Sequence, residues 1–574
     1  MKIVKRTMKG ITKKLILILF VIILLKIILS SFVFSPSAFS DEYTYSKMAR
    51  SFFYSQEFTI HELPTKQYLP LYPIVLSIAY LFQDMQIIYF IMKVVNAILS
   101  SLILIPSFLL AKEFISEKKA LITALIISVY PSNFSFSPLI MAENLFYPLF
   151  LLTIYLIYKA FTEDHYKWNI LSGISIGLTI LTKINGIILI PVIAILCLYK
   201  IKRNEFSLKK AFLLGISFIM VILPWIIRNT ILFGFSINSI FGNYSAFLEK
   251  TTFSPSSFLI WFIIYIGIII ISAGFIFPLL NLINLKDITN NRKLTYFKLI
   301  TIPTIILTIA IAANANAHSA FLLKTLLTWI TWRPLTRTVD VVIPLVLING
   351  MINLDNIDKI KKAMLPLLII PSLILILTTQ IIFFQLLPFN NMSLVLLGIM
   401  GHIIKSLFTN LVIITIIFSF LFITILSLIF YLYTKDKINS KNIMTITILF
   451  FLTSSIVNYG LIAYNANTYW YKNEQMKVGI WFNDYDKGES NVLIDNRNEG
   501  KILKIGQTGL YENTANNNTV TKIGFFMNNK ILIGEVNNLN EIDYIISENK
   551  LDLPIIKNEK DKIFIYKADI SKTI

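Results

Sequence analysis

The chain has 574 residues, of which 56% are hydrophobic and only 15% are charged, and its mean hydropathy is +0.70. This composition excludes an ordinary soluble globular protein, in which about 25% of the residues are charged. The net charge of +20 is therefore a signal of membrane topology before it is one of nucleic-acid binding, and we expect no nucleic-acid partner.

Apolar runs of membrane-spanning length recur along most of the chain. The first, Leu15–Phe34, is too long for the core of a signal peptide, so we interpret it as a retained helix. A transmembrane helix needs about 20 apolar residues, and we predict a polytopic α-helical membrane protein with about thirteen transmembrane helices. The predicted spans are 13–34, 86–111, 120–137, 143–158, 168–182, 184–199, 210–227, 257–280, 297–313, 338–354, 364–388, 408–433 and 443–463.

Two shorter apolar segments, 70–83 and 321–332, are predicted to lie at the membrane interface without crossing it. Lys and Arg are concentrated in the short segments on the same side as the N-terminus. This asymmetry predicts a multi-pass protein of the cell membrane with a cytoplasmic N-terminus. Thirteen spans then place the C-terminal residues outside the cytoplasm.

The sequence becomes polar from Asn465 onward. The segment NEQMKVGIWFND (473–484) is typical of a helix. Strand-like runs follow it, namely NVLID (491–495), GFFMNNKILIG (524–534), DYIIS (543–547) and KIFIYKA (562–568). We therefore predict a transmembrane domain at 1–464, with an outer loop at 35–86, and a small extracytoplasmic α/β domain at 465–574.

Cysteine and histidine offer no site for a metal. Cys197 is the only cysteine, so neither an intrachain disulfide nor a thiolate metal site can form. The histidines lack the spacing of metal ligands; they are His61, His165, His318 and His402.

Acidic residues stand at two places in the predicted outer loops. Asp41 and Glu42 follow the first span, and Glu143 opens the fourth. One interpretation is that these acids simply cap helices and have no chemical role, because acids in the first turn of a helix interact favourably with its dipole. That interpretation stays open for both places.

Basic residues also stand on the outer side, at the ends of spans. They are Lys183 in LTKING, Arg228 in LPWIIRNTILFG and Arg337 in RPLTRTVDVVIP. Cations on this side run against the usual charge bias. One explanation is that they extend to lipid head groups, and the other is that they bind a phosphate close to the bilayer.

Taken together, these features resemble a known group of enzymes. The chain resembles the GT-C type membrane glycosyltransferases that take a sugar from a polyprenyl or dolichyl phosphate, namely the protein O-mannosyltransferases and the bacterial enzymes that add aminoarabinose to lipid A. The resemblance covers most of residues 1–350 and depends on the order and placement of short motifs. These are the Asp41–Glu42 pair, LPLYPIVLSI (69–78), MAENLFYPL (141–149), LTKINGIILIP (181–191), LPWIIRNTILFG (223–234) and RTVDVVIPL (337–345).

The resemblance implies a transfer that inverts the anomeric centre in a single displacement. Such a transfer needs a general base and positive charge for the leaving phosphate. By resemblance, Asp41 is the base, Glu42 orients the acceptor or a bound cation, and Glu143 is a second acidic contact. The same resemblance makes Lys183, Arg228 and Arg337 candidate phosphate ligands.

The chain departs from the family pattern before the Pro-Leu-Tyr element. Relatives often carry a charged residue there, whereas this chain has Gln67, Tyr68 and Leu69. Either Lys66 or Glu62 takes that role, or the acceptor differs. A divalent cation between Asp41 and Glu143 is compatible with the pattern but is not required, because Lys and Arg can neutralise a monophosphate.

The implied partners are a polyprenyl-phosphate sugar donor, membrane lipid, and a protein, lipid or glycan acceptor. A transporter or a flippase for lipid-linked sugars is the alternative function. Ion-coupled transporters bury ionisable residues at mid-membrane and have internal repeats. No repeat is evident here, and Lys26 and Lys93 lack an acidic partner within their own spans. A membrane scaffold is a third interpretation, but it leaves the ordered outer charges unexplained.

Overall fold

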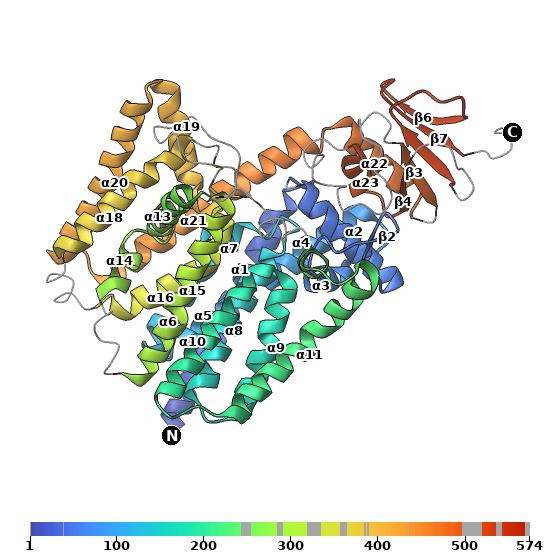
Figure 1. Cartoon of the computed structure of the whole chain (residues 1–574). Coiled ribbons are helices and arrows are strands. Elements are labelled where there is room, and N and C mark those ends of the chain that lie inside the picture. Colours follow the sequence, from blue (N-terminus) through green and yellow to red (C-terminus); the bar gives the residue numbers. More distant parts are fainter. Residues whose placement is uncertain are drawn as a thin grey trace.

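The computed structural model describes residues 2–37, 39–242, 254–283, 291–317, 334–355, 364–383, 386, 390–435, 437–488, 490–495, 519–534 and 542–568. The predicted interfacial segment 321–332 lies outside these residues. Figure 1 shows a large bundle of helices, with a small β-sheet domain packed at one end and the N-terminus at the opposite end. The chain is thus a polytopic helical membrane protein with a C-terminal mixed β-sheet domain.

Within the described residues, nine helical segments are long and apolar enough to cross a membrane. They are Ile11–Ser31, Met85–Ala111, Glu143–Thr162, Ile184–Lys202, Leu208–Phe233, Pro255–Ser272, Arg292–Ala317, Leu411–Thr434 and Ser440–Trp470. Each coincides with a predicted span.

The other four predicted spans also fall on helices, but these are shorter. They are α6 (Glu117–Ser128) with α7 (Pro131–Ser135), α9 (Tyr166–Thr182), α16 (Ile343–Asn353) and α18 (Met364–Thr378). The helix predicted at 120–137 is interrupted because Pro131 holds Tyr130 in an extended conformation, with ψ of 133°. The prediction of thirteen spans is therefore confirmed only in part. Helix α19 (Val395–Leu407) was not predicted.

The remaining helices of the bundle follow in chain order. They are α1 (Lys2–Ser31), α4 (Met85–Ser101), α5 (Leu104–Ala111), α8 (Glu143–Thr162), η2 (Ile184–Ile188), α10 (Leu189–Lys202), α11 (Leu208–Phe233), α12 (Ile237–Phe241), α13 (Pro255–Ser272), α14 (Ile276–Ile283), α15 (Arg292–Ala317), η5 (Thr336–Thr338), η6 (Asp340–Val342), η7 (Thr379–Phe383), η8 (Met392–Leu394), α20 (Leu411–Thr434), α21 (Ser440–Asn465) and η9 (Ala466–Trp470).

Helices α9 and α11 pack closely because α9 presents glycine to its neighbour. A Cβ atom on Gly173 would lie 2.0 Å from the Ser217 hydroxyl, and one on Gly177 would lie 2.8 Å from Val221. Small residues four positions apart let two membrane helices approach at backbone distance. The pairing fixes the end of α9, where Lys183 follows.

The segment between α1 and α4 folds into a compact loop. It contains α2 (Phe39–Ser55), the strands β1 (Thr59–Ile60) and β2 (Leu63–Pro64), α3 (Leu71–Leu76) and η1 (Ser77–Leu81). The two strands pair antiparallel through His61 and Glu62, which both have positive φ, as tight two-residue hairpins require. Asp41 and Glu42 lie in the first turn of α2.

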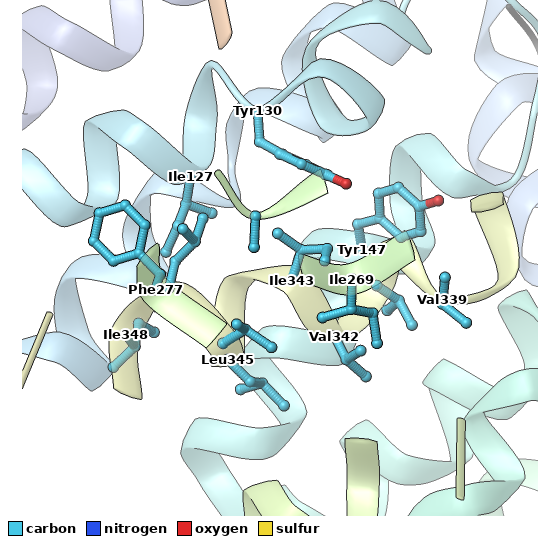
Figure 2. Close-up of a cluster of buried hydrophobic side chains, with 14 of the residues drawn as sticks. Ile127, Tyr130, Tyr147, Ile269, Phe277, Val339, Val342, Ile343, Leu345 and Ile348 are labelled. Carbon is cyan, nitrogen blue, oxygen red and sulfur yellow. The ribbon is translucent and has the colours of Figure 1, made fainter. Parts of the chain in front are cut away.

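A buried apolar core holds η6 and α16 in place. Figure 2 shows Val342, Ile343, Leu345 and Ile348 among side chains of the surrounding helices, and all four are buried. Moving a side chain of this size from water into an apolar environment stabilises the folded state by about 1.5–3 kcal/mol. The gain is smaller where the alternative environment is lipid, which is itself apolar. Close packing of these side chains holds η6 and α16 in place, and with them the preceding turn η5, which begins at Thr336.

The C-terminal part contains a five-stranded mixed sheet in the order β4-β3-β5-β7-β6. Strand β3 runs parallel to β4 and β5, and β7 runs antiparallel to β5 and β6. The elements are α22 (Glu474–Tyr485), β3 (Asn491–Asp495), α23 (Thr519–Phe525), β4 (Lys530–Gly534), β5 (Tyr544–Ser547), β6 (Ile555–Glu559) and β7 (Ile563–Lys567). The expected strand 524–534 is wrong in its first half, because Gly524 and Phe525 end α23.

The sheet domain is fastened to α2, the helix that carries Asp41. Lys47 Nζ donates to the Met527 carbonyl at 2.6 Å, and Arg50 Nε donates to the Asn528 carbonyl at 2.8 Å. These carbonyls follow the C-terminus of α23, where cations are favoured. Burial, with the nearby Arg50 charge as a smaller cause, lowers the pKa of Lys47 well below its usual value.

Candidate active site

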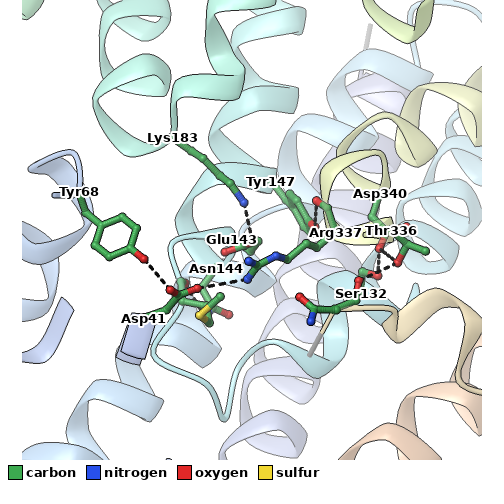
Figure 3. Close-up of polar contacts among 12 residues, drawn as sticks. Asp41, Tyr68, Ser132, Glu143, Asn144, Tyr147, Lys183, Thr336, Arg337 and Asp340 are labelled. Atoms are coloured by element: carbon green, nitrogen blue, oxygen red, sulfur yellow. Dashed lines mark hydrogen bonds and ion pairs between the residues drawn. The ribbon is translucent and has the colours of Figure 1, made fainter. Parts of the chain in front are cut away.

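A cavity of about 700 Å³ lies where the first loop meets the helix bundle. Its charged end is lined by Asp41, Glu143, Lys183 and Arg337. The chain supplies them from α2, the start of α8, the turn after α9, and η5. Figure 3 shows these four side chains converging, together with Tyr68. Four residues expected on separate turns thus share one cavity.

The charges of this cavity form two pairs. Lys183 Nζ donates to Glu143 Oε1 at 2.5 Å, and the Glu143 side chain is only 2% exposed. Arg337 Nη1 donates to Asp41 Oδ2 at 3.3 Å, with both side chains about one-quarter exposed, at 27% and 23%. The first pair is buried, whereas the second is accessible from the cavity.

Asp41 has a second partner that the sequence did not indicate. The Tyr68 hydroxyl donates to Asp41 Oδ1 at 2.5 Å, so both carboxylate oxygens accept a hydrogen bond. Tyr68 stands where relatives often carry a charged residue, just before the Pro-Leu-Tyr element. Its ring lies 4.7 Å from that of Tyr45, measured between centroids, and both rings line the cavity.

Glu42 points away from the cavity although it neighbours Asp41. It is fully buried, and its two oxygens accept from the backbone N–H groups of Ser37 and Ile140, each at 2.9 Å. Through these two bonds Glu42 ties the segment before α2 to the loop that precedes Glu143.

Arg228 and Lys66 are not among the residues that line the cavity. Arg228 donates to the carbonyls of Thr65 at 3.1 Å and Phe58 at 2.9 Å, so it clamps the two ends of the hairpin. The Lys66 ammonium lies 5.1 Å from the centre of the Phe233 ring. Of the seven predicted site residues, the structure brings four together and leaves Glu42, Arg228 and Lys66 outside.

Much of the remaining cavity lining is apolar. It includes Phe258 from α13 and Leu307 and Ile311 from α15. Both helices are candidate membrane spans, and Ile311 is exposed on the molecular surface. One cavity therefore extends from ionised groups to side chains suited to contact a hydrocarbon chain.

The donor set does not favour a divalent cation between Asp41 and Glu143. Each carboxylate already pairs with a basic side chain. Among the residues that the structure describes, no three His, Cys, Asp or Glu side chains gather at a point where they could hold a metal ion. The residues present therefore do not fit a divalent cation at this place.

Comparison with known proteins agrees with this geometry. A sequence model of the family described as dolichyl-phosphate-mannose-protein mannosyltransferase matches residues 70–227. The chain is a membrane glycosyltransferase, and the matched segment, 158 of its 574 residues, is the part that resembles this family. Its enzymes use lipid-phosphate sugar donors, and the match confirms the resemblance inferred from the short motifs. No curated protein sequence matches the chain significantly.

Two solved structures share the fold of this glycosyltransferase. ArnT from Cupriavidus metallidurans bound to undecaprenyl phosphate has a TM-score of 0.58 and 12% identity, and the alignment covers 97% of this chain and 98% of ArnT. The same enzyme in the apo state has a TM-score of 0.55 and 12% identity, with 98% of each chain covered. The likeness includes the C-terminal sheet domain, because nearly the whole chain aligns.

Proposed function

We propose that this glycosyltransferase moves a sugar from a polyprenyl phosphate to a hydroxyl group of a protein, lipid or glycan, with inversion at the anomeric carbon. The observation that supports this best is the cavity itself. It joins one accessible carboxylate, two cations and an apolar arm between membrane helices. A lipid-linked sugar phosphate requires this combination of groups.

In this proposal the donor enters the cavity with its phosphate at the charged residues. Its phosphate would lie between Lys183 and Arg337, because cations form the strongest hydrogen bonds to phosphate oxygens. Its prenyl chain would follow Phe258, Leu307 and Ile311 toward the bilayer. ArnT, which shares this fold, has been crystallised with undecaprenyl phosphate, and this supports a lipid phosphate as the ligand.

Asp41 is the general base in the proposed reaction. It takes the proton of the acceptor hydroxyl while the acceptor oxygen attacks the anomeric carbon. The bond from that carbon to the phosphate oxygen breaks, and the electron pair leaves with the phosphate. Arg337 and Lys183 stabilise the charge that develops there. Tyr68 holds the second oxygen of Asp41 and so fixes the direction in which the base points.

The remaining predicted residues have no direct contact with the reacting groups in this proposal. Glu42 positions Asp41 and the loop before Glu143, because it binds Ile140 across the cavity wall. Arg228 supports the hairpin that precedes Tyr68. Lys66 lies beside that hairpin and has no direct part in the chemistry. Glu143 holds Lys183 in place through their ion pair.

We also propose that the site faces the outside of the cell. Helix α2, which carries Asp41, and the sheet domain lie toward the end of the bundle opposite to the N-terminus (Figure 1). The excess of Lys and Arg on the side of the N-terminus supports a cytoplasmic location for that end. The division into a transmembrane domain at 1–464 and an extracytoplasmic domain at 465–574 belongs to the same proposal.

Sugar transfer by purified protein tests the proposal directly. The protein in detergent is mixed with a synthetic polyprenyl-phosphate mannose or aminoarabinose and with peptide, lipid and glycan acceptors, and products are measured by mass spectrometry. A deletion strain should lack one modification among its cell-envelope glycans. If the protein moves the intact donor across the membrane of proteoliposomes and transfers no sugar to any acceptor, a flippase is favoured instead.

A further inference from the structure

Asp340 is a buried acid that the mechanism above does not use. Its carboxylate lies behind the cavity wall, and the residue is only 1% exposed. It is not among the residues that line the cavity, whereas Arg337, three positions earlier, is. A carboxylate in such a place is costly unless its charge is well solvated by hydrogen bonds.

Four hydroxyl groups provide that solvation. Tyr130 donates to Oδ1 at 2.8 Å and Ser393 donates to the same oxygen at 2.9 Å. Thr336 donates to Oδ2 at 3.0 Å, and Ser132 donates to Oδ2 as well. Figure 3 shows Ser132 and Thr336 grouped around Asp340 on the side away from Asp41.

The donors come from separate parts of the chain, so Asp340 acts as a junction. Tyr130 and Ser132 belong to the start of α7, Ser393 to η8, and Thr336 to the turn that carries Arg337. Asp340 itself begins η6. One carboxylate therefore joins three segments that are remote in the sequence.

The junction reaches Arg337 through Thr336, and further bonds hold the Arg337 backbone. Its N–H donates to the Asn390 carbonyl at 3.2 Å, and its carbonyl accepts from the Tyr147 hydroxyl at 3.0 Å. Thr336, the residue before it, is held by Asp340 through its side chain and by Asn391 through its N–H. The Arg337 backbone is thus restrained on both sides, and its side chain extends into the cavity.

We propose that Asp340 is a positioning residue for Arg337: the hydroxyl cluster around Asp340 sets the place of the guanidinium that receives the leaving phosphate. The proposal depends on the proposed function for the role of Arg337. Because a shift of about 1 Å in a charge-stabilising group can cost roughly 100-fold in rate, the loss of this restraint should lower kcat more than it changes the acceptor KM.

Asp340→Asn is the decisive variant because it keeps the shape and removes the acceptor capacity of one oxygen. We expect kcat to fall at least 10-fold, with a smaller change in acceptor KM. In an Arg337→Ala background the same substitution should change kcat by less than about twofold, which is the scatter with which even independent substitutions add. Equal loss in both backgrounds, or wild-type kcat in Asp340→Asn, would overturn the proposal.

Milder variants keep the test valid if Asp340→Asn does not fold. Ser393→Ala and Tyr130→Phe each remove one donor from a different segment, and each should lower kcat in the wild-type background but not in Arg337→Ala. Ser137→Ala, which removes a buried hydroxyl that bonds to Tyr459, is the matched control and should show no such dependence on Arg337.

Binding of undecaprenyl phosphate separates this proposal from the proposed function. If no acceptor is ever glycosylated, the proposed function fails, but affinity for the lipid phosphate still reports on Arg337. Asp340→Asn should then weaken binding in the wild-type background and leave it unchanged in Arg337→Ala. Weakening by the same factor in both backgrounds would count against a positioning role.

Discussion

Arg337 and Asp41 are 296 positions apart in the sequence, and the guanidinium Nη1 lies 3.3 Å from the carboxylate Oδ2. Arg337, the proposed phosphate ligand, is therefore paired with Asp41, the proposed general base. A donor phosphate would compete for Arg337, since a phosphate forms charge-assisted bonds with the same guanidinium. Donor binding would then make Asp41 available to the acceptor.

Chemical labelling of Asp41 measures this exchange. Undecaprenyl phosphate should increase the rate at which a water-soluble carbodiimide and an amine modify Asp41, as quantified by peptide mass spectrometry. In the Arg337→Gln variant, Asp41 should be modified at this higher rate even when no lipid is added. Asp484, which is exposed on α22, should react at one rate throughout. A lipid phosphate that protects Asp41 from labelling would contradict the exchange.

Asp41→Asn should abolish sugar transfer and leave the protein folded. The loss should reach about 100-fold or more, because general-base catalysis contributes roughly 10²–10⁴-fold. Transfer is measured with a lipid-phosphate sugar, and folding by the unfolding temperature in detergent. Asp484→Asn is the matched substitution outside the cavity. Full activity of Asp41→Asn would remove Asp41 from the mechanism.

Lys183→Met should destabilise the protein because it leaves Glu143 buried without its cation. Breaking a buried pair typically costs about 3–5 kcal/mol, and Lys183→Met combined with Glu143→Gln should recover most of that stability. Thermal unfolding in detergent reports both. The same change at Lys119, whose ion pair with Asp355 is exposed, should cost less than about 1 kcal/mol. A double variant no more stable than Lys183→Met would show that the charge of Glu143 is not the cause.

The stability of the first loop should depend on pH through His61. Burial, helped by the nearby Lys47 charge, lowers the pKa of His61 from 6.5 to about 3. Its Nε2 atom lies 2.9 Å from the Tyr43 hydroxyl. Between these two pH values the unfolded chain binds a proton that the folded chain does not, so stability falls as pH falls from about 6.5.

His61→Gln should reduce that dependence by up to about 1.4 kcal/mol per pH unit. Unfolding temperatures of wild type and variant between pH 4 and pH 8 give the comparison. Above pH 6.5 the two proteins should respond to pH alike, which provides the internal control. Equal slopes below pH 6.5 would mean that His61 does not stay neutral in the folded protein.

The sequence was informative wherever a local pattern has a direct physical meaning. Apolar runs such as Leu208–Phe233 must be helical in a membrane because no water satisfies the backbone. The short apolar run in NVLID predicted a strand, and in the structure Val492 and Ile494 face a different apolar cluster from Leu493. The prediction weakened at Tyr130–Pro131, where one proline divides an apolar run into two short helices.

The sequence was also only partly informative about the candidate site. The motifs pointed to seven residues, and only four of them share the cavity, namely Asp41, Glu143, Lys183 and Arg337. They pointed equally to Glu42, Arg228 and Lys66, which do not line it. Nothing in the sequence showed which of the neighbours Asp41 and Glu42 faces the cavity. Successive residues of a helix point in different directions, and only the packing of the helix decides which direction leads to the site. Tyr68 carries no charge and was overlooked for that reason.

By itself the sequence determined that this is a helical membrane protein with a C-terminal part that contains strands, because hydropathy and short strand-like runs are local properties of the chain. Only the tertiary structure decided which charges meet. Lys183 and Glu143, or Arg337 and Asp41, become neighbours through the packing of helices that are remote in sequence. Such pairing depends on the crossing of whole helices and on the close approach that Gly173 permits, and no local pattern encodes it.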